Sequence, residues 1–127
     1  MATSIPAPIP PAAEQKAVVV AKAAINAARI LGLTNAQLGR VVGLSESQVS
    51  RVSHGKAALE GKPYELALLV VRLYRGLAGI VGNDDEAAES WMRAANHALG
   101  RAPIEHIQTA AGLFETVAYV DSFRARI

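Results

Sequence analysis

The stretch that decides the fold is residues 35–54, NAQLGRVVGLSESQVSRVSH. Its apolar side chains fall at the spacings at which two short helices, crossing at a steep angle, bury residues against each other. Gly39 is small where the two backbones approach, and Gly43 offers the left-handed turn that ends the first helix. The apolar positions are Leu38, Val42, Leu44, Val49 and Val52. The pattern predicts a helix-turn-helix, with an ordinary hairpin of two helices as the alternative.

Both helices of this stretch begin with a capping box. Thr34 and Gln37 form a T-x-x-Q box before the first helix, and Ser45 and Gln48 form an S-x-x-Q box before the second. In such a box each side chain satisfies a backbone amide of the other residue, which fixes where the helix begins. Two capped starts around a glycine stop support the helix-turn-helix over the alternative.

Composition places the chain among helical, cysteine-free proteins. Of its 127 residues, 51% are hydrophobic and 5% are aromatic, which favours a helical fold with thin side-chain layers. The absence of cysteine excludes disulfides and thiolate metal sites, and it fits a reducing compartment. The N-terminus lacks the charge and apolar core of a signal peptide, and basic residues interrupt both apolar runs, at 17–33 and 66–82. We expect a cytoplasmic protein with no membrane partner.

Charge is distributed unevenly along the chain. Residues 1–82 carry a net charge of +5 and residues 83–127 carry −3, which together give the net +2 of the chain. A basic half that holds the helix-turn-helix is suited to a polyanion, and the acidic half is then free for a second task.

The sequence predicts an all-α fold of about seven helices, without strands or repeats. A disordered arm with four prolines is expected over residues 1–11, and its contact with DNA or a neighbouring subunit is the alternative. A helix-turn-helix domain is expected over 12–62, and a helical domain over 63–127. The predicted helices cover residues 12–31, 35–42, 46–53, 63–81, 86–99, 103–109 and 112–123.

Two of these helices are expected to hold the domains together. The helix over 12–31 braces the helix-turn-helix from behind, and Pro63 starts the helix over 63–81. The second helix carries an apolar stripe wider than one supporting contact needs: Leu66, Leu69, Val70, Leu73, Leu77 and Ile80. We interpret 63–81 as a shared core helix, and an extension of its stripe into a dimer contact is also open.

The second helix of the motif is the candidate DNA reader. In a DNA-binding helix-turn-helix, this helix enters the major groove with its first turn facing the base edges. Arg51 is suited to a bidentate contact with guanine, and Glu46 to accepting a hydrogen bond from cytosine. The Ser47 hydroxyl can donate or accept a hydrogen bond, so it is compatible with more than one base.

Other polar residues flank the reading helix. The backbone amides at Asn35 are expected to point towards phosphate, and His54, Lys56 and Lys62 to clamp the DNA backbone. Gln48 has two open roles, because capping can occupy it fully. The expected DNA-binding set is Asn35, Glu46, Ser47, Gln48, Arg51, His54 and Lys56.

Nothing in the sequence favours an enzyme, a metal site or a bound cofactor. His97 and His106 are nine residues apart across a Gly-Arg-Ala-Pro turn, without the spacing of a zinc site. No nucleophile elbow, phosphate-cradling glycine loop or cysteine nucleophile is present. The acidic residues at 84–89 read as the start of a helix. We expect no catalytic residues and no metal ligands.

The C-terminal half carries a family resemblance. Residues 91–112, WMRAANHALGRAPIEHIQTAAG, resemble the C-terminal domain of Xre/MbcA/ParS-type antitoxins, and an Xre-like helix-turn-helix before it is the layout of that family. The resemblance covers about residues 15–127. Ala95 replaces a common proline, Arg101 replaces a common glycine, and the tail FRARI lacks the usual glycine. The matching positions are Trp91, Met92, Asn96, Leu99, Gly100, Pro103, Ile107, Thr109 and Gly112.

The resemblance implies an antitoxin of a type II toxin–antitoxin pair. Its partner would be a RES-domain toxin that consumes NAD+, by degrading it or by transferring ADP-ribose. The end of the antitoxin would lie over the NAD+ cleft of the toxin, where its arginines and the Ile127 carboxylate can pair with charged groups. The implied toxin-binding residues are Trp91, Arg93, Asn96, Arg101, Phe123, Arg124, Arg126 and Ile127.

Three functional readings follow. In the first, the protein neutralises a cognate toxin and represses its own operon, reading a palindromic operator as a homodimer. In the second, it is a stand-alone transcription regulator whose C-terminal half senses a ligand or only dimerises. In the third, which the sequence favours least, it is an enzyme.

Overall fold

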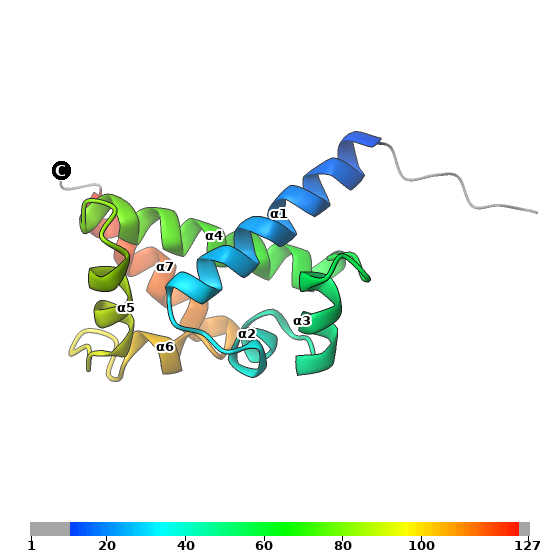
Figure 1. Ribbon diagram of the computed structural model, residues 1–127. Helices are drawn as coiled ribbons and strands as arrows, with labels where there is room; N and C mark the ends of the chain where they lie inside the picture. Colours follow the sequence, from blue (N-terminus) through cyan, green and yellow to red (C-terminus); the bar gives the residue numbers. More distant parts are fainter. Residues whose placement is uncertain (1–10, 125–127) are drawn as a thin grey trace, which may run out of the picture.

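A computed structural model describes residues 11–124, and it shows seven α-helices (Figure 1). No residue of this range lies in a strand, so the predicted all-α class and the number of helices are confirmed for it. None of these helices combines the length and the apolar character needed to cross a bilayer. The helices are α1 (Pro11–Ile30), α2 (Asn35–Val42), α3 (Glu46–Ser53), α4 (Gly61–Ile80), α5 (Asp85–Arg93), α6 (Pro103–His106) and α7 (Ala110–Arg124).

Helix α4 is the centre of the molecule. It packs against both α1 and α7 (Figure 1). Val70, Leu73 and Leu77, from the middle of its predicted apolar stripe, are at most 1% exposed. The stripe is narrower at its ends, because Leu66 and Leu69 are only partly buried and Ile80 is 39% exposed.

The helix-turn-helix has the predicted bounds and caps. Thr34 Oγ1 accepts a hydrogen bond from the amide of Gln37 at 3.1 Å, while Gln37 Oε1 accepts one from the amide of Thr34 at 2.9 Å. Ser45 and Gln48 repeat this exchange at 3.1 and 2.8 Å. Gly43 ends α2 with a φ of +79°, the left-handed conformation that its place in the sequence predicts.

Two polar bridges connect the helix-turn-helix side to the C-terminal helices. Arg40 of α2 donates a hydrogen bond from Nε to Oε1 of Gln108 at 2.7 Å, and Gln108 lies two residues after the end of α6. Arg93, at the end of α5, donates from a terminal guanidinium nitrogen to the carbonyl oxygen of Gly32 at 3.2 Å. With the packing of α4, these contacts join both halves into one body.

Several predicted bounds need correction in the N-terminal half. Helix α1 begins at Pro11, so the last residue of the predicted arm is helical, and residues 1–10 lie outside the described range. Helix α4 begins at Gly61, two residues before Pro63. Proline fits within the first turn of a helix, where its missing N–H is not needed, and for that reason Pro63 does not mark the first residue.

The largest error concerns the helix predicted over 86–99. Helix α5 ends at Arg93, where Ala94 turns to an extended conformation with ψ of 144°. Asn96 then accepts a hydrogen bond from the amide of Leu99 at 3.1 Å, and this local side-chain bond replaces a helical one. The apolar spacing around Trp91 continues past the true end, which is why periodicity extended the helix too far.

The last two helices also shift. Helix α6 ends at His106, three residues early, and α7 begins at Ala110, two residues early. Thr109 Oγ1 accepts from the amide of Gly112 at 3.0 Å, which satisfies a free amide in the first turn of α7. Gly112 itself faces the carbonyl oxygen of His106 so closely that no Cβ fits between them.

The close approach within the helix-turn-helix can be tested by substitution of Gly39. A Cβ at this position would collide with the carbonyl oxygen of Leu44, which belongs to the backbone of the turn and cannot move aside cheaply. We expect Gly39→Ala to lower the free energy of unfolding by about 1–3 kcal/mol in chemical denaturation. Gly79→Ala is the matched control, because Gly79 is exposed in α4 with open space around its Cβ position. It should raise stability by about 0.5–1 kcal/mol. Equal effects of both variants would contradict the close approach.

Candidate DNA-reading and toxin-binding surfaces

Helix α3 has one buried and one exposed face. Val49 and Val52 are 1% and 8% exposed and pack into the core. The predicted base-reading residues all lie on the exposed part of the helix: Glu46, Ser47, Gln48 and Arg51. The division follows from the apolar spacing of the helix, which leaves its polar side chains facing solvent.

The exposed residues of α3 differ in how free their polar groups are. Within residues 11–124, Arg51 makes no hydrogen bond or ion pair, so its guanidinium has all its donors available. Gln48 uses its side-chain oxygen to accept from the amide of Ser45, while both donors of its NH₂ group stay available for an outside partner. The hydroxyl of Ser47 lies 3.3 Å from that of Ser45. Glu46 also makes no hydrogen bond or ion pair within residues 11–124, so the charged groups of Arg51 and Glu46 are both free for an outside partner.

The flanking residues are also exposed. Asn35 is the first residue of α2, and Lys56 lies in the loop that follows α3. His54 Nδ1 lies 2.7 Å from the carbonyl oxygen of Ser50, to which it can donate, and its Nε2 is then the nitrogen left for a partner. Lys62 lies 3.2 Å from Glu65, and such an exposed pair contributes little to stability.

At the other end of the molecule, three aromatic rings gather between α5 and α7. Trp91 stacks on Tyr119, with ring centroids 6.5 Å apart and planes 17° apart. Tyr119 meets Phe123 edge-to-face at 4.9 Å. Trp91 and Tyr119 are partly buried and Phe123 is 37% exposed, so the cluster is accessible from outside.

The remaining residues of the predicted toxin-binding set are used within the chain or lie at its end. Arg93 bonds Glu89 at 3.0 Å in addition to Gly32, and Asn96 supports the turn to Leu99. Arg124 is exposed at the end of α7, while Arg126 and Ile127 lie outside the described residues. Contact of any of these residues with a toxin stays a prediction.

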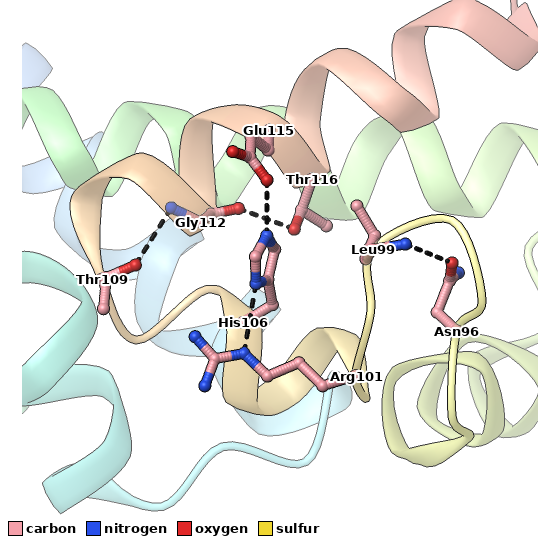
Figure 2. A network of polar contacts seen from close by, with 8 residues as sticks. All are labelled: Asn96, Leu99, Arg101, His106, Thr109, Gly112, Glu115 and Thr116. Atoms are coloured by element: carbon pink, nitrogen blue, oxygen red, sulfur yellow. Dashed lines mark hydrogen bonds and ion pairs between the residues drawn. The ribbon is translucent and has the colours of Figure 1, made fainter.

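Arg101, His106 and Glu115 form a chain of polar contacts (Figure 2). Arg101 Nε donates to His106 Nδ1 at 3.2 Å, and His106 Nε2 lies 2.7 Å from Glu115 Oε2. Since Nδ1 accepts, the ring proton is on Nε2 and is donated to Glu115. The contact between His106 and Glu115 joins α6 to α7. Within residues 11–124, no group of three His, Asp or Glu residues is arranged to hold a metal ion.

A raised pKa marks the contact between α4 and α5. The Tyr74 hydroxyl lies 3.4 Å from Asp85 Oδ1. Burial, and then the charge and hydrogen bond of Asp85, raise the pKa of Tyr74 above its ordinary value of 10.0. The protonated phenol donates this hydrogen bond to Asp85, the first residue of α5.

The sequence interpretation missed three features of the C-terminal surface. Tyr119 completes the aromatic cluster, Glu115 pairs with His106, and Phe114 is 67% exposed on α7. The spacing of Glu115, Tyr119 and Phe123 at every fourth position indicates one face of a helix. That signal could have found the first two features, whereas the exposure of Phe114 depends on which face of α7 meets α4.

Two family descriptions match the chain in succession. The antitoxin Xre-like helix-turn-helix domain matches residues 11–72, and the antitoxin Xre/MbcA/ParS C-terminal toxin-binding domain matches residues 77–126. The chain is also similar to a chain in the crystal structure of the M. tuberculosis MbcT–MbcA toxin–antitoxin complex. The two share 22% sequence identity over 86% of this chain and 96% of that chain, with a TM-score of 0.64. No curated protein sequence matches the chain.

These matches define the class of the protein: a helix-turn-helix domain followed by a toxin-binding domain. The chain belongs to the Xre/MbcA/ParS family of antitoxins. The similarity to the M. tuberculosis chain supports the fold, and the family membership depends on the two domain matches.

The aromatic cluster can be tested by fluorescence, because Trp91 is the only tryptophan of the chain. Tyr119→Ala removes the ring on which the indole stacks, so the emission maximum should move to longer wavelength. The loss of the ring pair should also lower stability by about 0.5–1.5 kcal/mol, in addition to the lost burial. Phe114→Ala removes an exposed aromatic of the same helix and should leave the emission unchanged. A shift with Phe114→Ala, or none with Tyr119→Ala, would contradict the stacking.

Proposed function

We propose that this antitoxin neutralises a cognate RES-domain toxin, which consumes NAD+ by degrading it or by transferring ADP-ribose, and that it represses its own operon. Residues 63–127 bind the toxin, and residues 12–62 bind operator DNA. A homodimer reads two half-sites of a palindrome, because a two-fold protein matches a two-fold operator. The partners are thus the toxin, the operator and a second copy of the chain.

One observation carries this proposal: the two candidate surfaces lie at opposite ends of one body (Figure 1). The exposed residues of α3 are at one end, and the end of α7 with its aromatic cluster is at the other. A duplex held by α3 therefore leaves the C-terminal surface open to a protein partner. The uneven charge of the chain, basic before residue 83 and acidic after it, supports the same division.

The C-terminal segment is proposed to block the NAD+ cleft of the toxin. Phe123 and the rings behind it provide an apolar anchor next to the cleft, because partly exposed aromatic side chains commonly anchor interfaces. Arg124 and Arg126 follow directly and can pair with a catalytic carboxylate in the cleft. In this arrangement the aromatic rings provide the affinity for the toxin, and the arginines inhibit its consumption of NAD+.

The separation of the two surfaces predicts a selective defect for Arg51→Ala. Removal of one bidentate guanine contact should weaken operator binding by about 1–3 kcal/mol and relax the base preference at one position. Toxin binding should be unchanged. Electrophoretic mobility shift with the upstream DNA measures the first, and co-purification with the product of the adjacent gene measures the second.

Arg75→Ala is the charge-matched control for this experiment, since Arg75 is exposed on α4 and outside the helix-turn-helix. It should leave the affinity for the operator nearly unchanged. If Arg51→Ala lost both DNA and toxin binding, the two-surface proposal would be wrong. If the wild-type chain associated with no adjacent gene product, a stand-alone transcription regulator would be the better reading.

The blocking segment predicts that binding and inhibition can be separated. Removal of residues 124–127 spares Phe123 and its contact with Tyr119, so the complex with the toxin should still form. Inhibition of NAD+ consumption should be lost, because the arginines no longer occupy the cleft. Turnover of NAD+ by the purified complex measures this.

A chain that lacks residues 1–10 is the control, because that change leaves the C-terminal surface intact. Undiminished inhibition by the chain without residues 124–127 would rule out the block. Loss of the complex itself would place the main contact in these residues and contradict the role of the aromatic anchor.

A further inference from the structure

A groove of about 460 Å³ runs between α1 and the loop that follows α3. On the α1 wall, apolar residues such as Val18 and Ile25 alternate with Lys22, Asn26 and Arg29. The opposite wall includes Val52 and Leu59 beside Lys56. The surface inside is more apolar than polar, so water in the groove is readily displaced by another apolar surface.

The first half of α1 extends past the rest of the body (Figure 1). Val18 and Val19 on this half are 54% and 64% exposed, although the helix continues into the core from Ala24 onward. Apolar side chains on the projecting part of a helix, next to an apolar groove, are typical of an interface.

We propose that a second copy of this chain covers the groove, through antiparallel pairing of the two α1 helices about a two-fold axis close to Val18. Each projecting half of α1 then lies against the groove of the other copy, so both grooves are filled by the same contact. This contact is the interface of the homodimer in the proposed function. The inference rests on the proposed function only for what the dimer does.

Charge complementarity sets the register of the pairing. Glu14, Val18 and Lys22 are each one turn apart and share one face of α1. In an antiparallel pair centred on Val18, Glu14 lies opposite Lys22 of the second copy, and two-fold symmetry repeats this ion pair. Neither residue has an ion pair within residues 11–124, so both are available.

The position of the groove connects the dimer to the reading helices. Val52 and Ser53, at the end of α3, line the groove beside the loop that carries Lys56. A second copy seated there holds its own α3 at a fixed distance from the first. Such a fixed distance is what reading two half-sites of a palindrome requires.

Single cysteines test the register, because the chain has no cysteine of its own. Val18→Cys places two thiols near the proposed axis, where their Cβ atoms can approach to disulfide distance. Under mild oxidation it should give a covalent dimer on a non-reducing gel. Val19→Cys is the matched control: it is more exposed but faces about 100° around the helix, so it should cross-link much less.

Charge reversal tests the ion pairs independently. Glu14→Lys and Lys22→Glu each oppose like charges twice per dimer, and each should weaken dimerisation by about tenfold or more, measured by sedimentation equilibrium. The double variant restores opposite charges and should recover most of the affinity. Circular dichroism of each variant checks that the helices are retained.

The outcomes separate this inference from the proposed function, because all measurements use the full chain without toxin or DNA. A wild-type chain that sediments as a monomer overturns the inference. The groove would then be open to a different occupant, such as a small apolar anion held beside Lys22 and Lys56. A dimer that cross-links through residue 19 and not through residue 18 also overturns it. Either result leaves toxin binding untouched.

Discussion

The structure depends on the burial of one wide face of α4. The central side chains of this face, Val70, Leu73 and Leu77, are buried where α4 packs against both α1 and α7. Hydrophobic burial is not directional, so one apolar face can be shared by two helices that pack on it. The helix-turn-helix and the C-terminal helices therefore share a core, and neither surface is carried on a flexible tether.

The helix-turn-helix was predictable because its signals are local. The capping boxes at Thr34 and Ser45 and the glycine at 43 each act within a few residues, and the structure has all three where the sequence places them. The end of α5 was not predictable in this way. It depends on the Asn96 side chain competing for the amide of Leu99 against a helical bond that the apolar pattern favours. Similarly, Pro63 is compatible with any position in a first turn, so it marks the start of α4 only approximately.

For the candidate surfaces, the sequence predicted which residues take part better than it predicted how their side chains are arranged. The sequence indicates the exposed face of α3 because Val49 and Val52 identify the buried one. For the C-terminal half, it could not show that Arg93 reaches back to Gly32, or that Gln108 accepts from Arg40. Such contacts depend on how distant helices pack. The residues that bring the helices together are spread over the chain, and no short pattern records them.

The shared helix has a consequence for how the protein is removed. A protein with two separate domains can lose one to a protease and keep the other. Here a single cut within α4 opens the core under both surfaces at once, because Val70 and Leu77 belong to one apolar layer. Degradation that begins there is all-or-none: it removes the helix-turn-helix surface and the C-terminal surface in the same event, with no fragment that keeps one of them.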